Sequence, residues 1–509
     1  MLLSLFALPC LHAAAAFARL AEYAAVTSNG PIIGHPANTS GVVEYLGIPY
    51  AQPPVGPLRF AAPQKHIANG TFVASHYGYT CPQTASARVN YAGRTPQAQR
   101  IIADFAGQLN HTQSEDCLTL NVWTRPRPGA PKPVLVFIHG GRFTIGESNT
   151  PFFHGDKIAG REELVVVTLN YRVSIWGFPG QPGAAKNLAF LDQRLAVEWV
   201  RDNIAAFGGD PDKIVISGQS AGGAAVDFWS YAYKHDPIAS GIIPHSGTAF
   251  SFPTSSESTA ASRWYNVSAQ LGCGDSGDVL ECVRSRDVGE IKTAVAALRL
   301  PPVSGQGRSE AVFQPTVDNK TAFSRETLTE MTQTGNFARV PYLVGNTHFE
   351  AGYYRWAAYG AGSILTETQW DNFDLVTFTC PSTYGAAARA RFGVPSWLFR
   401  YGGDWDNVRL YPNSSAYHGA DMHMLFGNSV AVSGLPEEKA QDRLKKVVMH
   451  AWATFAKDPQ NGLQELGWSQ YETGTLIELG FEKSSVPAFV SPDKYAGPCP
   501  TLNLSFYDI

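Results

Sequence analysis

Three short runs of apolar, β-branched residues in the first half of the chain predict buried strands. They span residues 134–139, 164–169 and 214–217. Each run is continuous rather than alternating, as expected for strands covered on both faces of a largely parallel sheet. Between the last two runs, the apolar residues of 188–207 recur at helical spacing. Strand, helix and strand in this order form the repeating unit of a parallel α/β sheet.

The remaining pattern favours one continuous domain with insertions. A short amphipathic stretch at residues 97–109 lies within a segment rich in Gly, Pro, Asn and Ser at residues 81–117, and a helix-like stretch covers residues 437–456. A length of 509 residues alone would allow two or more domains, but large α/β enzymes often carry long insertions within one unit. We therefore expect a single catalytic domain over residues 19–509.

The first 18 residues are typical of a secretory signal. They contain a Leu- and Ala-rich apolar run that ends in the small-x-small triplet Ala16-Phe17-Ala18, which predicts cleavage after Ala18. A buried N-terminal helix is the alternative, because no Lys or Arg precedes the apolar run. No later apolar run is long enough to span a bilayer, so we expect a secreted protein with no stable membrane insertion.

The cysteine and asparagine positions agree with export. Cys10 falls inside the predicted signal, which leaves an even set: Cys81, Cys117, Cys273, Cys282, Cys380 and Cys499. An even set in a secreted chain can pair completely. Proximity along the chain favours Cys81 with Cys117, Cys273 with Cys282 and Cys380 with Cys499, although other connectivities remain open. Candidate N-glycosylation sites are Asn38, Asn69, Asn110, Asn266, Asn319, Asn413 and Asn503.

Composition excludes several classes of function. With 44% hydrophobic and 16% charged residues, the chain can bury a large core. A formal net charge of -4 without a local Lys/Arg cluster argues against nucleic-acid binding and favours a small uncharged partner. The sequence has no metalloprotease motif, zinc-finger spacing or phosphate-binding glycine loop in its proper setting. We expect no metal and no cofactor.

The sharpest motif is Gly218-Gln219-Ser220-Ala221-Gly222. It directly follows a predicted strand and directly precedes a run of small residues. This strand, sharp turn and helix are the context of a nucleophile elbow in the α/β-hydrolase fold. A serine at the start of a helix also benefits from nearby N–H groups, which favour negative charge. Ser220 is the predicted nucleophile; a plain tight turn is the alternative.

A second glycine segment provides candidate donors for an oxyanion. The sequence HGGRF at residues 139–143 follows a predicted buried strand. In the α/β-hydrolase arrangement, one donor comes from such a loop and another from the residue after the nucleophile. The main-chain N–H groups of Gly141, Arg142 and Ala221 are therefore the predicted oxyanion hole. An ordinary glycine turn at a strand end is the alternative.

The acid and the base of a catalytic triad should follow the serine in that order. Glu350 comes shortly after the apolar run 342–344, and a carboxylate there can orient an imidazole. His418 precedes a glycine and the apolar stretch 422–426, and it is the predicted base. His423 lies within that apolar stretch, which favours a packing role, and His348 precedes the acid. The expected fold is an α/β-hydrolase with a mostly parallel central sheet, flanking helices and lid-like insertions.

With these residues in place, the chain resembles the type-B carboxylesterase and lipase family, which includes cholinesterases and fungal lipases. The matching motifs run from YLGIPYA at residues 45–51, through EDCLTLNV at residues 115–122, to His418-Gly419. The resemblance implies the triad of Ser220, Glu350 and His418 and the oxyanion hole named above. It also implies a lid-like loop closed by a Cys81–Cys117 disulfide and a second disulfide between Cys273 and Cys282.

Two departures from the family pattern affect the expected substrate. Arg142 occupies a place that is often glycine, and Gln219 stands where cholinesterases carry glutamate. Without that charge, a cationic ester loses one partner, so we expect a secreted serine hydrolase of neutral carboxylic esters, acting through an acyl-enzyme on a small-molecule or lipid ester. The alternatives are a triacylglycerol lipase, a biosynthetic esterase or acyltransferase, and a non-catalytic cholinesterase-like binding protein.

Overall fold

The computed structural model describes residues 23–499 except residues 40, 69, 299–310, 361 and 415. The predicted signal at residues 1–18 lies outside the described residues, as do the candidate glycosylation sites Asn69 and Asn503. The other candidate sites are all exposed: Asn38, Asn110, Asn266, Asn319 and Asn413. Exposure is what an asparagine needs in order to carry a glycan.

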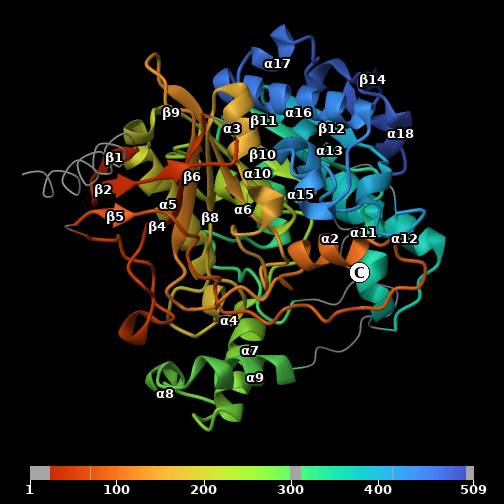
Figure 1. Ribbon diagram of the computed structural model, residues 1–509. Helices are drawn as coiled ribbons and strands as arrows, with labels where there is room; N and C mark the ends of the chain where they lie inside the picture. Colours follow the sequence, from red (N-terminus) through yellow and green to blue (C-terminus); the bar gives the residue numbers. More distant parts are fainter. Residues whose placement is uncertain are drawn as a thin grey trace, which may run out of the picture.

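A large twisted sheet crosses the molecule (Figure 1), and its 11 strands follow the order β14-β13-β12-β11-β10-β9-β7-β8-β6-β4-β3. The strands are β3 (His35–Pro36), β4 (Val43–Pro49), β6 (Thr119–Thr124), β7 (Lys132–Ile138), β8 (Val165–Leu169), β9 (Gly209–Gln219), β10 (Gly241–His245), β11 (Tyr342–Thr347), β12 (Ser396–Tyr401), β13 (Leu476–Leu479) and β14 (Ala488–Val490). Along the sheet from β13 to β8, each strand runs parallel to the next one. The outer strands pair antiparallel. The sheet is therefore mostly parallel, as the apolar runs predict.

The predicted strand, helix and strand unit is present. Its helix is α5 (Leu188–Asn203), which continues as a single turn, η3 (Ile204–Phe207). The strands on either side of this helix in sequence, β8 and β9, flank β7 on its two sides. The connection therefore crosses over β7, which allows all three strands to run parallel.

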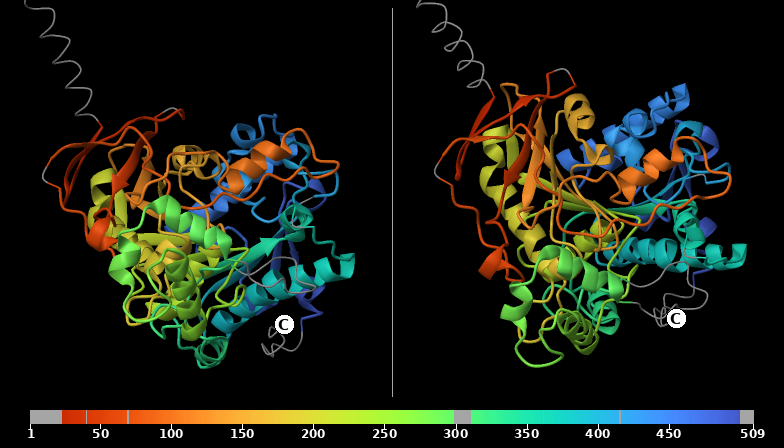
Figure 2. Two further views of the ribbon diagram at one scale, coloured as in Figure 1. Left: turned by 90° about the horizontal axis from the view of Figure 1, so that it is seen from below. Right: turned by 60° about the horizontal axis from the view of Figure 1, so that its bottom comes forward.

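Helices cover both faces of the sheet (Figures 1 and 2). Side chains of β7 alternate between two hydrophobic clusters, because successive strand residues point to opposite faces. One cluster includes residues of α5, α6 (Ala221–Ala232) and α13 (Cys380–Arg391). The other includes residues of α3 (Asp156–Glu162), α14 (Met422–Phe426) and α16 (Lys439–Lys457). Two separate cores of this kind explain why the central strands are apolar without alternation.

Three disulfides join Cys81 to Cys117, Cys273 to Cys282 and Cys380 to Cys499. This is the pairing that proximity along the chain favours. The second bridge lies in a small helical lobe below the sheet (Figure 1), between α7 (Glu257–Gln270) and α8 (Leu280–Arg284), and α9 (Val288–Ala297) completes that lobe.

The segment between Cys81 and Cys117 forms a loop that carries the amphipathic helix α2 (Ala98–Phe105). Gln83, near one end of the loop, makes two hydrogen bonds with the main chain of Gly146: it accepts from the N–H at 2.8 Å and donates to the carbonyl at 2.9 Å. Farther along, the Thr95 N–H donates to the Leu410 carbonyl at 2.9 Å. The loop is thus tied to the segment after β7 and to the C-terminal half of the chain.

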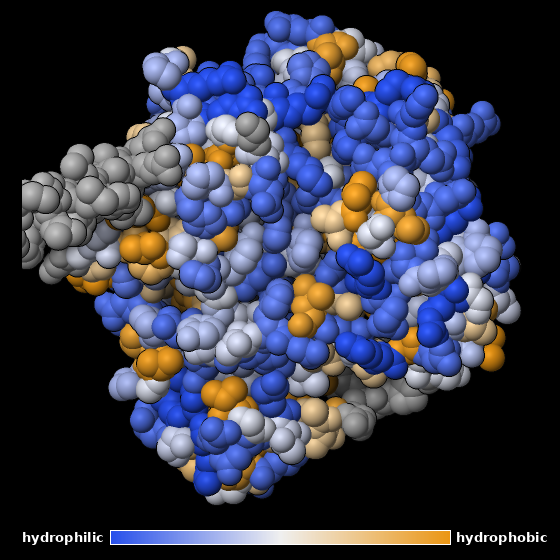
Figure 3. Space-filling view, viewed as in Figure 1, coloured by the Kyte–Doolittle hydropathy of each residue, from blue (hydrophilic) through white to orange (hydrophobic). Residues whose placement is uncertain are grey.

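The surface is mostly hydrophilic on the face seen in Figure 3, with apolar residues in small separate groups. Scattered apolar side chains of this kind are normal for a folded chain. Within residues 23–499, apart from the gaps given above, no helix combines the length and the apolar character that crossing a bilayer requires.

Candidate active site

Ser220 occupies a tight bend between β9 and α6. Its backbone has φ 59 and ψ −120, a conformation that non-glycine residues rarely adopt. The flanking glycines allow this bend: a Cβ on Gly218 would lie 2.2 Å from the Gly222 carbonyl oxygen, and one on Gly222 would lie 2.0 Å from the carbonyl oxygen of Ile138. The Ser220 N–H donates to the His245 carbonyl at 2.8 Å. The bend that the G-x-S-x-G motif predicts is present.

Glu350 and His418 are brought together from distant parts of the chain. Glu350 lies between β11 and α11 (Ala351–Gly360), and its Oε2 is 2.5 Å from His418 Nδ1. Its Oε1 accepts a hydrogen bond from the Thr347 N–H at 2.7 Å. Both side chains are almost fully buried. An ionised carboxylate only accepts, so the Nδ1 of His418 carries the proton and its Nε2 keeps a lone pair.

That lone pair faces the elbow. The side-chain nitrogen of Gln219, the residue before Ser220, is 3.1 Å from His418 Nε2. The hydroxyl of Tyr354, on α11, is 3.3 Å from the same nitrogen. Among the described residues, no hydrogen bond joins the Ser220 hydroxyl to His418. The three predicted triad residues therefore lie around one site, and Gln219 and Tyr354 are the present donors to the imidazole.

A further carboxyl group, Asp374, lies beside this pair. It ends α12 (Glu367–Asp374), and its Oδ1 accepts from the Ala351 N–H at 2.7 Å. Burial and the negative charge of Glu350 raise the pKa of Asp374 well above its usual range. Asp374 therefore adds a second acidic group to the surroundings of Glu350. No sequence motif identifies Asp374 as part of the site.

The predicted oxyanion loop packs against the nucleophile. A Cβ on Gly140 would lie 2.9 Å from Ser220 Cβ, so only glycine allows this approach. Gly141 and Arg142 follow with φ 103 and φ 60, and the Gly141 carbonyl accepts the N–H groups of residues 144 and 145, both at 3.0 Å. On the other side of Ser220, the N–H of Ala221 belongs to the first turn of α6, where helical N–H groups have no partner within the helix. The predicted oxyanion loop therefore packs against the serine, and the predicted third donor belongs to the residue that follows it.

Aromatic side chains form the wall around His418. Ring centroids of Tyr354 and Phe378 lie 5.0 Å and 5.1 Å from the imidazole, and those of Phe105 and Tyr353 lie 6.1 Å and 6.3 Å away. Phe105 comes from α2, so the disulfide-closed loop contributes directly to the site. None of these rings was predicted from the sequence, because their approach depends on tertiary packing.

The Arg142 side chain lies near this wall. Burial raises the pKa of Tyr353, and the positive charge of Arg142 opposes that rise. The residue that departs from the family's glycine therefore brings a positive charge whose effect reaches this wall.

A second buried histidine and carboxylate pair lies behind the elbow. His245, at the end of β10, has its Nδ1 2.7 Å from Asp421 Oδ2, and the indole N–H of Trp452 donates to its Nε2 at 3.0 Å. Asp421 follows His418 by three residues, while the His245 carbonyl holds the Ser220 N–H. The pair thus links the loop of the base to the bend of the nucleophile. Sequence reasoning missed it, because a histidine inside an apolar strand has no distinguishing pattern.

The competing histidines lie elsewhere. The Tyr417 hydroxyl is 2.9 Å from His423 Nε2, and burial lowers the pKa of His423 to about 3. Arg400 donates to His348 Nδ1 at 3.2 Å, and burial lowers the pKa of His348 to about 4. Both imidazoles are neutral at pH 7 and pack against side chains outside the site. The packing role predicted for His423 agrees with its surroundings.

Comparison with known proteins gives a consistent result. A family model described as "Carboxylesterase family" matches residues 22–373 and 353–496. The chain is 34% identical to a chlorogenic acid esterase of Aspergillus niger over 86% of this chain and 83% of that protein. It is 31% identical to secreted lipase 5 of Gibberella zeae, over 90% of each chain. It is 30% identical to the para-nitrobenzyl esterase of Bacillus subtilis, over 89% of this chain and 93% of that protein.

Proposed function

Because this chain belongs to the carboxylesterase family and is a carboxylic ester hydrolase, we propose that it cleaves neutral carboxylic esters through an acyl-enzyme on Ser220. The observation that carries this proposal is the contact of 2.5 Å between Glu350 and His418, whose other ring nitrogen lies 3.1 Å from the side-chain nitrogen of Gln219 in the elbow. An imidazole oriented by a buried carboxylate beside a serine is the arrangement that activates a hydroxyl nucleophile.

In the first half-reaction, the Ser220 hydroxyl replaces Gln219 or Tyr354 as the donor to His418. His418 Nε2 takes the hydroxyl proton as the oxygen attacks the ester carbonyl carbon, and the carbonyl electron pair moves onto its oxygen. The N–H groups of Gly141, Arg142 and Ala221 stabilise that oxyanion. When the carbonyl re-forms, the bond to the leaving alkoxide breaks, and His418 returns the proton to it.

In the second half-reaction, water takes the place of the alcohol. His418 removes a proton from the water as its oxygen attacks the acyl carbon, and the same N–H groups stabilise the second oxyanion. Collapse of this intermediate breaks the bond to Ser220, which regains a proton from His418 and releases the carboxylic acid. Throughout, the Glu350 carboxylate stabilises the imidazolium that forms in each half. The mechanism consumes one water and requires no cofactor.

The surroundings of the triad support a neutral ester with an apolar part. The rings of Phe105, Tyr353 and Phe378 surround the imidazole, and the residue beside the nucleophile is the uncharged Gln219. The disulfide-closed loop is hydrogen-bonded to its neighbours through Gln83 and Thr95. These contacts favour an esterase that is active on dissolved substrate over a lipase that requires a lid to open.

Hydrolysis of p-nitrophenyl esters from acetyl to palmitoyl tests the proposal. We expect the highest kcat/KM at short or medium acyl chains, and a loss of at least about 10⁴-fold in Ser220→Ala. Ser217→Ala is the matched control, because Ser217 is buried on the preceding strand and its hydroxyl has no hydrogen-bond partner among the described residues. Hydrolysis that survives in Ser220→Ala contradicts the proposal. A palmitoyl optimum that depends on an emulsion surface would assign the chain to the lipases.

We further infer that the protein is exported and glycosylated. Three disulfides support an oxidising compartment, and five candidate asparagines are exposed. A relative of this chain is named a secreted lipase. Expression in a eukaryotic host should deliver protein to the medium that begins at residue 19 and loses mass on enzymatic removal of N-glycans. Retention of residues 1–18, or a mass that does not change, contradicts this inference.

A further inference from the structure

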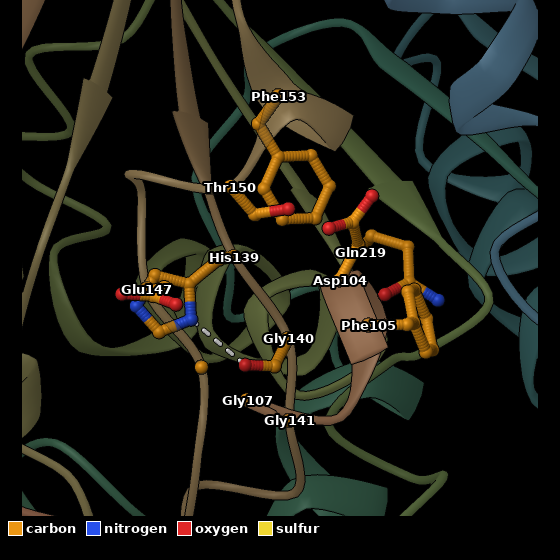
Figure 4. Close-up of a pocket in the computed structure, with 11 residues that line it drawn as sticks. Asp104, Phe105, Gly107, His139, Gly140, Gly141, Glu147, Thr150, Phe153 and Gln219 are labelled. Atoms are coloured by element: carbon orange, nitrogen blue, oxygen red, sulfur yellow. Dashed lines mark hydrogen bonds between the residues drawn. The ribbon is translucent and has the colours of Figure 1, made fainter. Parts of the chain in front are cut away.

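A small pocket lies between the disulfide-closed loop and the oxyanion loop, next to the residue that precedes the proposed nucleophile (Figure 4). Asp104 and Phe105 of α2 line it from one side, and Gly140 and Gly141 line it from the other. Gln219, the residue before Ser220, also lines it. The pocket has a volume of about 20 Å³, which is enough for one group of the size of a water molecule or a hydroxyl.

One residue that lines this pocket, Gln219, has a buried side-chain oxygen without a hydrogen-bond partner in the described part of the chain. The side chain is fully buried, and this oxygen is its Oε1. Its amide orientation follows from His418: the imidazole Nε2 accepts, so the nitrogen of Gln219 is the atom that faces it at 3.1 Å. The oxygen is then left toward Gly140, where an added Cβ would lie 2.8 Å from it. A buried oxygen without a donor is costly unless a donor is supplied.

A second acceptor faces the same space. Asp104 is half-buried, and no group in the described part of the chain donates a hydrogen bond to its carboxylate. The neighbouring acid, Glu147, is already engaged, since its Oε2 contacts the Thr80 hydroxyl and lies 3.0 Å from His111 Nδ1. Asp104 and the Gln219 oxygen are therefore two acceptors on this pocket that receive no hydrogen bond from the described part of the chain.

The charges around the pocket argue against a cation as the donor to these acceptors. Burial raises the pKa of Asp104 to about 7, with Arg100 and His111 opposing the rise and Glu147 adding to it. At neutral pH, Asp104 is therefore only partly ionised, and positive groups already lie beside it. The small volume also excludes a substituted ammonium. A neutral hydroxyl fits both the size and the charge.

We propose that this pocket is a subsite for a hydroxyl group on the ester substrate, held by the Asp104 carboxylate and the Gln219 amide oxygen. The subsite rests on the proposed function, because its position next to the elbow of Ser220 matters only if Ser220 is acylated. It assigns the enzyme to esters that carry a free hydroxyl a few bonds from the scissile carbonyl. Asp104 and Gln219 then act in specificity, whereas the triad acts in the chemistry.

Matched substrate pairs that differ by hydroxyl against methyl test the subsite. On the alcohol side, the pair is 2-hydroxyethyl butyrate and propyl butyrate; on the acyl side, it is the p-nitrophenyl esters of 3-hydroxypropionic and butyric acid. We expect the wild type to prefer the hydroxyl member of at least one pair by about 2- to 10-fold in kcat/KM, which is the range for an ordinary hydrogen bond. Asp104→Leu should abolish that preference while the methyl member is still hydrolysed.

A control variant and three separate outcomes distinguish the subsite from the proposed function. Gln99→Leu changes the same helix, at a side chain that hydrogen-bonds Gln108 and does not line the pocket, and it should keep the wild-type preference. Equal rates for both members of both pairs in the wild type would overturn the subsite and leave the pocket to solvent. A preference that survives in Asp104→Leu would overturn the role of Asp104. Failure to hydrolyse any of the four esters would instead contradict the proposed function.

Discussion

Two buried histidine and carboxylate pairs in the described part of the chain have the same chemistry in different surroundings. In both pairs, Nδ1 faces a carboxylate oxygen, at 2.5 Å for His418 with Glu350 and at 2.7 Å for His245 with Asp421. The pairs differ at the other nitrogen. That of His418 faces the elbow of Ser220 and the aromatic wall of the site, whereas that of His245 accepts the Trp452 N–H inside the core.

This difference shows what makes such a pair suitable for catalysis. A carboxylate fixes the tautomer of either imidazole, but proton transfer also requires a nucleophile within reach of the second nitrogen. The Trp452 indole closes that position for His245, since an indole donates and does not exchange for substrate. We therefore expect the His418 pair to carry the reaction and the His245 pair to carry stability.

The largest expected effect comes from a substitution that removes His418 and leaves the His245 pair intact. His418→Gln should lower kcat by about 10⁴-fold or more, because no base remains to take the Ser220 proton. His245→Gln, the matched change at the second pair, should keep kcat within about tenfold of the wild type, since the glutamine amide can still donate to Asp421. Steady-state hydrolysis of p-nitrophenyl butyrate by the two purified variants measures both. Equal losses would remove the distinction between the pairs.

The next effect concerns stability. His245→Leu leaves the Asp421 charge buried without a donor and should lower the free energy of unfolding by about 3–5 kcal/mol. Urea denaturation followed by tryptophan fluorescence measures the change in a protein with oxidised disulfides. A shift below about 1 kcal/mol would show that the pair contributes little to the fold.

His423 is a buried histidine whose hydrogen-bond partner is the Tyr417 hydroxyl and not a carboxylate. The pH dependence of stability therefore compares it with the two histidines that face carboxylates. Burial lowers the pKa of His423 from 6.5 to about 3 in the folded protein, so between these values the unfolded chain binds the extra proton. Stability therefore falls as the pH drops below 6.5, by up to about 1.4 kcal/mol per pH unit for each such residue. In denaturation at pH 7, 6 and 5, His423→Gln should show a shallower fall than the wild type. Parallel curves would contradict the neutral state assigned to this imidazole.

The smallest effect concerns Tyr354, whose hydroxyl contacts His418 Nε2 as the Trp452 indole contacts His245 Nε2. Tyr354→Phe removes only the hydroxyl that lies 3.3 Å from His418 Nε2. A single neutral hydrogen bond of this kind contributes about 1 kcal/mol, so kcat/KM should change less than tenfold. A loss near that of His418→Gln would instead make the hydroxyl part of the proton transfer.

Much of the fold could be predicted from the sequence, because the pattern of residues reflects local geometry. The continuous apolar runs predicted β7, β8 and β9, since both faces of these strands are buried. The glycines of the elbow predicted the bend at Ser220, which a Cβ at the flanking positions would prevent. The order of serine, acid and base then selected Glu350 and His418 from the many other carboxylates and histidines.

The rest depends on contacts between residues that are distant in sequence. Asp421 meets His245 across 176 positions, and nothing around either residue indicates the other. Asp104 and Phe105 reach the site only because the disulfide-closed loop folds back over the segment after β7. Asp374 lies beside Glu350 because the end of α12 is hydrogen-bonded to the start of α11. Sequence reasoning named candidate residues that the fold brings together, while the residues that surround them required the structure.

The most direct test of the central claim is covalent labelling with a fluorophosphonate, followed by mass spectrometry of the digested protein. The wild type should gain one adduct per chain, on the peptide that contains Ser220, and should lose ester hydrolysis in step with labelling. His245→Gln should label at close to the wild-type rate, and His418→Gln should label far more slowly. An adduct on another residue, or hydrolysis that continues after Ser220 is fully labelled, would contradict the account.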